Sequence, residues 1–345
     1  MMLSRGSYLA IARNLLMDSL PYMDDKDVYL GLQPLYHAVG AFIMPCWVRG
    51  ATHIITRSFR PEIAFPMIEK EGVTIIKTVP TVLVRLVTYP DIKKYNFSSI
   101  HTIIYGASPM PVGKLEEAIK IFGPVFLQNY GQSEAPMTIC ALRREEHILE
   151  GTPEEVARLA SVGRPYTMVE VKIVDDDGKE VPYGVTGELI VRGDHTMMGY
   201  LNNPEQTAEV LKDGWIYTGD IGQKDKDGYI FLTDRKGEMI VSGGLNVYPS
   251  EVEQVLHRHP AVLEACVFGV PDEKWGEAIK AVVAFRPSMV ASEKEIIEFC
   301  KEHLVSYKKP VSVDFLESLP KSATGKVLRR ELRESYWKGY DKRIH

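Results

Sequence analysis

The sequence predicts an α/β protein with a β-rich subdomain, followed by a small α+β domain. Three features of the pattern indicate this architecture. In the first part of the chain, short apolar runs alternate with helix-compatible segments. From about residue 161, closely spaced apolar runs are separated by turn residues. The final third contains both helix-compatible segments and strand-like runs. Two or more domains are expected, because 345 residues suffice for more than one core.

The first part of the chain has the rhythm of a sheet covered by helices. The opening segment 1–20 is expected to be helical, since charged residues interrupt its apolar positions without a cleavage-site pattern. Strand-like runs follow in VYLGLQPL, THIIT, VTIIKTVP and IHTIIYGAS, separated by the helix-compatible PEIAFPMIEKEG and PVGKLEEAIKIFG. From about residue 161, VEVKIVDDDGKEVPYGVTGELIVRG and GYIFLTDRKGEMIVSGG are typical of antiparallel strands joined by tight turns.

The final third predicts a small α+β domain. SEVEQVLHRHP and SEKEIIEFCKEHL are compatible with helices, and VLEACVFGVP and AIKAVVAF with strands. We place the domain boundary near Asp234–Arg235, which gives a large domain at 1–234 and a second domain at 235–345. The charge and turn propensity at this point would also suit an ordinary hairpin.

Composition narrows the class of protein. With 41 basic and 46 acidic side chains, the net charge of −5 gives no argument for a nucleic-acid partner. No uninterrupted apolar run of about 18 residues predicts a transmembrane segment. The four cysteines are scattered without CxxC spacing, which favours buried thiols in a reducing, cytoplasmic setting. The sequence does not determine the oligomeric state and is compatible with a homo-oligomer.

The segment FLQNYGQSEAP could hold a nucleotide. Tyr130 offers a flat stacking face, Gly131 permits close approach of the backbone, Ser133 can donate to a phosphate, and Glu134 can bind magnesium through oxygen. Taken alone, the segment reads equally well as a polar turn.

Three further segments carry polar groups in turn-like settings. Asp220 in GWIYTGDIG could accept hydrogen bonds from two ribose hydroxyls, although an Asp-containing β-turn explains it too. DRKGEMIVSGGLNVYPSEVE combines Arg235 with a glycine pair before a helix start. Lys326 lies in LPKSATGKVLRR, where a solvated basic face is the simpler interpretation of the segment by itself.

The order and combination of these segments resemble the adenylate-forming superfamily, and its acyl-CoA synthetases in particular. YGQSE, YTGD, DRKGEMIVSGGLNVYP and PKSATGK match the superfamily's signatures in sequence order, and PLYHAVG, GELIVRG and MMGYLNNPEQT add further matches. Chance agreement across all of them is improbable. The resemblance implies a truncated AMP-binding large domain followed by a small, mobile C-terminal domain.

The resemblance also implies a reaction in two steps. Such enzymes join a carboxylate to the α-phosphate of ATP with release of pyrophosphate, and a thiol such as that of coenzyme A then displaces AMP. Magnesium assists the first step. On this basis the adenine would lie among Gly106, Ala107, Ser108, Asn129 and Tyr130. For the first three of these residues, a plain strand-to-turn transition is the alternative.

Roles for the charged and hydroxyl residues follow from the same resemblance. Ser133 stands where the superfamily usually has Thr and would meet the α-phosphate, while Glu134 would hold Mg²⁺. Asp220 and Arg235 would bind the ribose from the two domains. Lys326 would stabilise the charge that develops during adenylation, so its loss should reduce adenylation more than thioester formation.

Three other positions matter for the thiol and the acid. Gly244 would line the passage of the pantetheine arm, where a Cβ would narrow the approach. The hinge position usually holds Asp or Lys in this superfamily but is Gly237 here. His37 in PLYHAVG would border the acyl pocket, although a lone histidine is more often structural. The resemblance favours a fatty acid as substrate, with an aromatic acid second.

The beginning of the chain departs from the superfamily pattern. Its members carry a Ser/Thr/Gly-rich loop ending in Pro-Lys, which holds the β- and γ-phosphates, just before a segment that MMLSRGSYL resembles. The expectation is therefore an acyl-CoA ligase that forms part of a longer enzyme. The alternatives are a truncated, inactive protein that binds AMP or acyl-adenylate, an aryl-CoA ligase, a peptide-synthetase adenylation domain, and a luciferase-like oxidase.

Overall fold

The computed structural model describes residues 1–32, 35–36, 38–56, 59–322, 326–338 and 340. The chain divides into two compact units, Met1–Leu232 and Thr233–His345. The helices and strands predicted from the sequence are largely present, and the division into units falls within the strand Ile230–Arg235.

The large unit is built on a seven-stranded sheet with the strand order β2-β1-β3-β4-β5-β6-β7. The first five strands run parallel, and the last two are antiparallel to their neighbours. Their bounds are Val28–Gly31 (β1), Thr52–Ile55 (β2), Ile75–Lys77 (β3), Thr102–Gly106 (β4), Phe126–Tyr130 (β5), Cys140–Leu142 (β6) and Arg164–Pro165 (β7).

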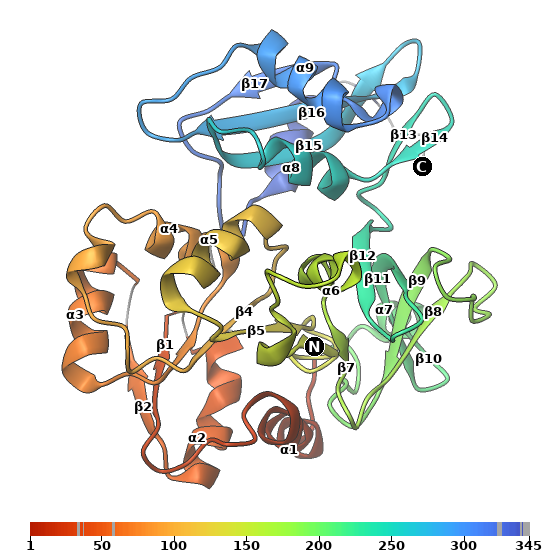
Figure 1. The fold of residues 1–345 in the computed structure, drawn as a ribbon. Coiled ribbons are helices and arrows are strands. Elements are labelled where there is room, and N and C mark those ends of the chain that lie inside the picture. Colours follow the sequence, from red (N-terminus) through yellow and green to blue (C-terminus); the bar gives the residue numbers. More distant parts are fainter. Residues whose placement is uncertain (33–34, 37, 57–58, 323–325, 339, 341–345) are drawn as a thin grey trace. The chain divides into compact units, whose positions relative to one another are not determined.

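Helices cover both faces of this sheet (Figure 1). On one face, strand residues such as Ile76, Ile103 and Phe126 pack with residues of α3 (Pro61–Glu71), α4 (Pro80–Val87) and α5 (Val112–Phe122). On the other face, Ile75 and Leu127 pack with residues of α1 (Arg5–Asn14) and α2 (Ile43–Arg49). Apolar residues at consecutive strand positions thus serve two cores, as the buried runs of parallel sheets require.

The predicted helical segments end where their glycines stand. Helix α3 is followed by Gly72, with a φ of 60°, and α5 is followed by Gly123, with a φ of 81°. Both glycines have a positive φ, which favours glycine, and Gly72 adopts the left-handed helical conformation. The opening segment is a helix as predicted: α1 is capped by Ser4 and continues into a π-helical turn, Leu15–Ser19.

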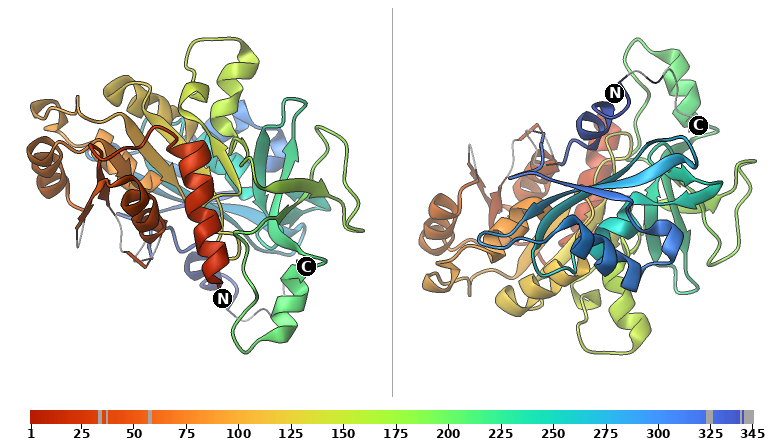
Figure 2. Two further views of the ribbon diagram at one scale, coloured as in Figure 1. Left: turned by 90° about the horizontal axis from the view of Figure 1, so that it is seen from below. Right: turned by 90° about the horizontal axis from the view of Figure 1, so that it is seen from above.

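The β-rich part of the large unit is a second, antiparallel sheet with the order β10-β11-β9-β8, to which β12 adds beside β11. Figure 2 shows α1 running along the large unit beside this region, and the backbone at Met2 pairs with that at Gly199. The strands are Glu170–Val174 (β8), Gly187–Arg192 (β9), Leu211–Lys212 (β10), Trp215–Lys224 (β11) and Ile230–Arg235 (β12); two short helices, Pro153–Ala157 (α6) and Pro204–Val210 (α7), complete the unit.

The second unit has its own sheet, ordered β14-β13-β16-β15, with β17 parallel to β16. Its core includes Val255 of α8, Val267 of β15 and Ile296 of α9. Ser292 begins α9 with a reciprocal capping box to Glu295, which explains the sharp start of that helix. The elements are Ile240–Ser242 (β13), Leu245–Val247 (β14), Pro249–Leu256 (α8), Val262–Asp272 (β15), Gly276–Phe285 (β16), Glu293–His303 (α9), Ser312–Phe315 (β17) and Arg329–Glu334 (α10).

Candidate nucleotide site

The carboxyl ends of β4 and β5 meet at the edge of the large sheet. Gly106 and Asn129 are register partners in this parallel pair. A Cβ at Gly106 would lie 2.1 Å from the backbone oxygen of Asn129, so only glycine fits here. The chain then turns through Ala107, which adopts a φ of 73° and is exposed, to the half-buried Ser108. Ligands of parallel α/β sheets bind at such an edge.

Asn129 carries an unsatisfied polar group into this edge. Its side chain is 3% exposed, and neither its amide oxygen nor its amide nitrogen has a hydrogen-bond partner among the described residues. Leaving such groups unpaired costs about 1–3 kcal/mol each. A flat ligand that offers both a donor and an acceptor, as adenine does, would satisfy both atoms at once.

Tyr130 and Asp220 are joined by a direct hydrogen bond. The Tyr130 hydroxyl donates to Asp220 Oδ2 at 2.5 Å, and both side chains are buried. Burial, followed by the neighbouring Asp220 charge, holds the pKa of Tyr130 well above its usual range. The tyrosine therefore stays a neutral donor to the carboxylate at physiological pH.

An irregular stretch of β11 presents Asp220. The register with β9 shifts between Tyr217 and Ile221, so that extra residues bulge out of the strand. Gly219 adopts a φ of 70° within this bulge, and the amide of Asp220 donates to Thr218 Oγ1 at 3.1 Å. The Thr218 hydroxyl in turn donates to the backbone oxygen of Leu189 at 2.7 Å, which anchors the bulge to β9.

The loop after β5 places Ser133 and Glu134. Gly131 begins this loop, and a Cβ there would lie 2.4 Å from the amide nitrogen of Met137, so the tight path requires glycine. Ser133 is exposed. Glu134 is half-buried and is held twice: its Oε1 accepts from the Tyr200 hydroxyl at 2.6 Å, and its backbone oxygen accepts from Met197 N at 2.8 Å.

Tyr200 is a residue to which the sequence interpretation assigned no role. It belongs to the segment MMGYLNNPEQT, which contributed only to the resemblance. Burial and the hydrogen bond to Glu134 raise the pKa of Tyr200 to about 12. The pairing of Tyr130 with Asp220 also lacked a signal in the sequence, because 90 residues separate the two.

The remaining predicted residues lie in the second unit or outside the described residues. Arg235 is exposed, and its backbone oxygen accepts from the amide of Glu238 in a turn that contains Gly237. Gly244 has a φ of 80° and is exposed, and a Cβ added to it would meet no atom within 4 Å. Lys326 is exposed, and its backbone pairs with Ser322. His37 lies outside the described residues.

The second unit also holds a partly buried charge cluster. Arg329, the first residue of α10, forms ion pairs with Glu238, with Glu253 at 2.7 Å and with Asp234 at 3.7 Å. Burial disfavours the charge of the guanidinium, but the carboxylates of Glu253 and Glu238 raise the pKa of Arg329 well above its usual range. The cluster connects the helix that follows Lys326 with the turn that follows Arg235.

The donor set suits Mg²⁺ bound mainly by a substrate rather than by a protein cage. Among the described residues, no group of three or more His, Cys, Asp and Glu side chains is placed to hold a metal ion. Glu134 offers one carboxylate whose Oε2 accepts no hydrogen bond from the described protein. Mg²⁺ commonly binds one or two carboxylates together with substrate phosphates, so the residues present fit this ion.

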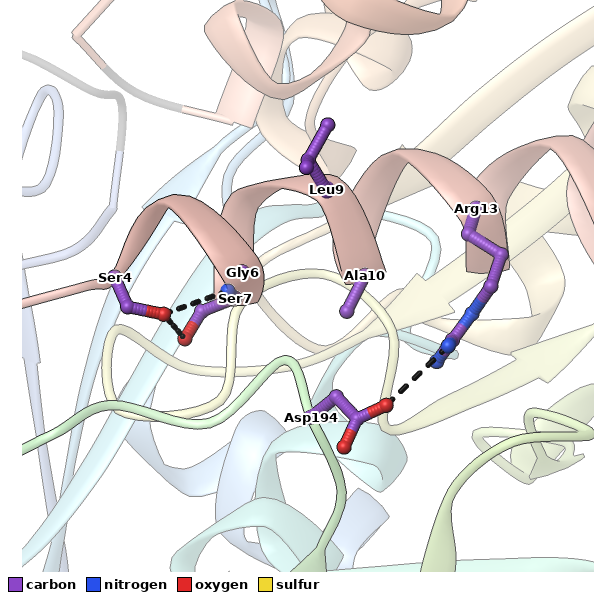
Figure 3. Close-up of a pocket in the computed structure, with 7 residues that line it drawn as sticks. All are labelled: Ser4, Gly6, Ser7, Leu9, Ala10, Arg13 and Asp194. Carbon is purple, nitrogen blue, oxygen red and sulfur yellow. Dashed lines mark hydrogen bonds and ion pairs between the residues drawn. The ribbon is translucent and has the colours of Figure 1, made fainter.

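A separate depression lies along α1, from Ser4 to Arg13 (Figure 3). It is lined by residues of α1 and by Asp194, and Arg13 bridges to Asp194 at 3.3 Å. None of the predicted site residues lines it.

None of the described helices is long and apolar enough to cross a membrane. The four cysteines are buried and form no disulfide.

Fold and site together define an adenylate-forming enzyme fold, and the chain belongs to the AMP-binding enzyme family. The family model matches residues 1–201, and the model of the AMP-binding enzyme C-terminal domain matches residues 251–326. The predicted family and fold class are thereby confirmed.

The chain is similar to several named proteins of this family. It is 40% identical over 318 residues to the medium/long-chain-fatty-acid–CoA ligase FadD8 of Mycobacterium tuberculosis (strain ATCC 25618 / H37Rv), a match that covers 90% of this chain and 54% of the relative. It is 34% identical to a feruloyl-CoA synthase of Amycolatopsis sp, covering 97% of this chain and 66% of the relative.

A solved structure matches closely as well. The amide bond synthetase McbA from Marinactinospora thermotolerans superposes with a TM-score of 0.89 at 33% identity, over 96% of this chain and 65% of that one. The chain thus spans between about half and two thirds of the length of these relatives.

Proposed function

We propose that the chain carries the adenylate-binding and lysine-bearing parts of an ATP-dependent acyl-CoA ligase. In this reaction a carboxylic acid is joined to AMP with release of pyrophosphate, and the thiol of coenzyme A then takes the acyl group and releases AMP. The observation that supports it best is the unsatisfied amide of Asn129, buried at the sheet edge beside Gly106 and followed by the Tyr130–Asp220 pair.

We assign the nucleotide contacts to the large unit. Asn129 would meet the edge of adenine. The backbone of residues 106–108 would lie against the face of the base, since Gly106, Ala107 and Ser108 have small side chains. The Asp220 carboxylate, oriented by Tyr130, would accept hydrogen bonds from the ribose hydroxyls. Gly131 would let the backbone of the following loop approach the nucleotide.

The phosphate contacts would come from the loop after β5. Ser133, which is exposed, would donate to the α-phosphate. Glu134 would hold Mg²⁺ through the oxygen that Tyr200 leaves unoccupied. The ion would offset the negative charge of the phosphates when it is bound.

Residues of the second unit would serve the two half-reactions in turn. Lys326 would stabilise the charge that develops on the α-phosphate during adenylation, an effect worth roughly 10²–10³ in rate per donor. Arg235 would contact the ribose, and Gly244 would leave room for the pantetheine arm. Gly237 would supply backbone freedom to the turn between them.

Fatty acids are the leading substrates in this proposal, and aromatic acids are the second class. FadD8 is named for medium- and long-chain fatty acids and the Amycolatopsis protein for feruloyl-CoA, so both classes are found among the relatives. His37 would border the acyl pocket. The partners would accordingly be ATP, the carboxylic acid and coenzyme A.

A second candidate function is binding of AMP or acyl-adenylate without its formation. It would use the nucleotide contacts of the large unit at Asn129 and Asp220 and would not require Lys326. Exchange of labelled pyrophosphate into ATP, measured with a panel of fatty and aromatic acids, separates the two.

Acid-dependent exchange that is abolished in Lys326→Ala establishes adenylation, and formation of the acyl thioester when coenzyme A is added establishes the ligase. Tight binding of AMP with no exchange for any acid establishes the binding protein instead. If neither AMP binding nor exchange is detected, both candidates are wrong. Asn129→Leu is the matched variant for the nucleotide site, since it should weaken AMP binding by about tenfold or more if the amide meets adenine.

A further inference from the structure

Lys77 is a buried lysine with no anionic partner among the described residues. It is the last residue of β3 and is 1% exposed. Its Nζ donates to the backbone oxygen of Thr78 at 3.3 Å, and it forms no ion pair with any described carboxylate. Lysine is almost never fully buried unless it is paired, because its charge is costly to remove from water.

Lys114, also buried in the large unit, shows how an ion pair compensates for the burial of a lysine charge. Lys114 of α5 is 3% exposed, and its Nζ contacts both carboxylate oxygens of Glu117 at 2.7 and 2.9 Å. Lys77 has no such carboxylate. Burial lowers the pKa of Lys77 to about 7, so its amine is present in both forms near neutral pH, and both forms donate hydrogen bonds.

The alternation of strand side chains places Lys77 on the face of the sheet that carries the nucleotide site. Ile75, two residues before Lys77, and Leu127, two residues before Asn129, belong to the same core beside α1 and α2. Since side chains alternate along a strand, Lys77 and Asn129 point to that same face. Both stand at the carboxyl ends of their parallel strands, where ligands of such sheets bind.

The strand register gives the depth of Lys77 relative to the nucleotide contacts. Lys77 pairs with Ile104 of β4, whereas Asn129 pairs with Gly106. Along the strand direction, Lys77 therefore lies two residues farther from the carboxyl edge of the sheet than Asn129 does, and β4 separates their two strands. On its other side it pairs with Gly31, where the side chain of Val39 occupies the space that a Cβ would take.

We propose that the Lys77 amine binds an oxygen-bearing group of the acid, at the end distal to the carboxylate that is activated. This inference rests on the proposed function. With the nucleotide at Asn129 and Gly106, the acyl group would extend along the same face toward β3. A purely apolar tail would leave the amine unpaired, whereas a carboxylate, phenol or ketone oxygen would accept its hydrogen bond.

The substrate class that follows is an acid with a distal oxygen, in preference to an unsubstituted fatty acid of the same length. Removing a required hydrogen-bond acceptor from a substrate costs more than changing its apolar bulk, because a buried donor is then left unsatisfied. The discrimination should thus exceed that of an ordinary apolar pocket.

Binding of non-hydrolysable acyl-sulfamoyl adenosines tests this without requiring turnover. The set comprises one unsubstituted acyl chain and three of equal length that end in a carboxylate, a phenol or a ketone. Titration calorimetry of the full chain should show at least one oxygen-bearing analogue binding about tenfold or more tighter than the unsubstituted one. Comparison of the carboxylate, phenol and ketone analogues identifies which oxygen group is preferred.

Variants then assign the preference to Lys77. Lys77→Met should abolish the preference while keeping affinity for the unsubstituted analogue, and Lys77→Gln should keep part of it. Lys114→Met is the matched control, since it removes a buried lysine with a structural partner and should leave the preference intact. Thermal unfolding of each variant establishes that it is folded.

Two outcomes overturn the inference, and they are distinguishable. Equal affinity of the wild-type chain for all four analogues, or a preference that survives in Lys77→Met, overturns the role of Lys77 but leaves the proposed function standing. Failure of all four analogues to bind overturns the proposed function, and the role of Lys77 with it. The first measurement uses the wild-type chain alone, so it does not depend on the folding of a variant.

Discussion

The hydroxyl of Tyr130 donates a 2.5 Å hydrogen bond to the carboxylate of Asp220, across 90 residues of sequence. The tyrosine ends a strand of the parallel sheet, and the aspartate stands in the bulge of the antiparallel sheet. This bond therefore ties the two sheets of the large unit together at the candidate nucleotide site. It also restricts the orientation of the Asp220 carboxylate.

Tyr130→Phe should weaken AMP binding. Hydrogen bonds to charged groups contribute about 1.5–3 kcal/mol, so an increase in Kd of at least tenfold is expected. If Asp220 meets the ribose, the binding of free adenine should change far less. Calorimetric titration with AMP and with adenine measures both, and Tyr217→Phe on the same strand as Asp220 is the control. An equal loss for AMP and adenine would contradict the ribose role.

Tyr200→Phe should weaken the binding of divalent metal at Glu134. The tyrosine hydroxyl holds Glu134 Oε1, so its removal lets the carboxylate adopt other orientations. Mn²⁺ binding in the presence of ATP, followed by electron paramagnetic resonance, should show an affinity about tenfold or more lower if Glu134 is a metal ligand.

The control for this variant is Tyr229→Phe. Tyr229 also donates to a glutamate, with its hydroxyl 2.8 Å from Glu146 Oε1, but none of the proposed site residues is involved. Removing this hydroxyl should leave Mn²⁺ affinity unchanged. Equal effects of the two substitutions would indicate a general loss of structure rather than a role for Tyr200.

Arg329→Gln should destabilise the second unit strongly. It would leave the carboxylates of Asp234, Glu238 and Glu253 without their shared cation; breaking a fully buried ion pair costs about 3–5 kcal/mol, which is the upper bound for this partly buried cluster. Hydrogen exchange of β15 and β16 within the full chain measures the change in opening free energy. Arg329→Lys should restore little, because one ammonium cannot replace a planar guanidinium that contacts several carboxylates.

The neighbouring residue provides the control for Arg329. Arg330 pairs with Glu334 on the exposed side of α10, and its side chain is 83% exposed. Exposed pairs of this kind contribute about 0–1 kcal/mol. Arg330→Gln should therefore leave exchange in β15 and β16 nearly unchanged, and a comparable effect of both substitutions would refute the special role of the partly buried cluster.

The stability of the large unit should fall as the pH drops from about 6.5 toward 4. Burial lowers the pKa of both His147 and His195 to about 4, from an ordinary value of 6.5. Between these values the unfolded chain binds protons that the folded chain does not. Each histidine should thus contribute a slope of about 1.4 kcal/mol per pH unit to the free energy of unfolding.

Substitution of His195 isolates one of these contributions. Its ring is fully buried, and neither ring nitrogen has a hydrogen-bond partner in the part of the chain that the structure describes. In His195→Gln the slope between pH 6.5 and 4 should decrease by about 1.4 kcal/mol per pH unit relative to the wild type. Urea unfolding at several pH values measures it, and an unchanged slope would show that His195 does not titrate as its burial predicts.

Much of the fold could be predicted from residue patterns because the determinants are local. PEIAFPMIEKEG forms α3, which Gly72 ends, and SEKEIIEFCKEHL forms α9, which Ser292 caps. Periodicity, caps and glycines act within a few residues of each other, so the sequence displays them directly. The signature segments likewise identified the family before any contact was known.

The pairing of residues across the site required the tertiary structure. YGQSE and MMGYLNNPEQT each contain half of the Glu134–Tyr200 bond, but nothing within either segment specifies the partner. The same holds for Arg329, which reads as part of an ordinary basic run and yet lies between three carboxylates. Such contacts depend on the order and register of strands and helices that local propensity does not encode.

The sequence by itself determined the family, the fold class and the residues that could contact a nucleotide, because those properties reside in short motifs and local periodicity. Only the tertiary structure decided that Tyr130 orients Asp220 and that, within the described ranges, the Asn129 amide has no partner and the buried Lys77 has no counterion. Burial and hydrogen bonding depend on neighbours that are distant in the sequence and come together only when the chain folds. These neighbours determine the pKa and the hydrogen-bonding capacity of each side chain.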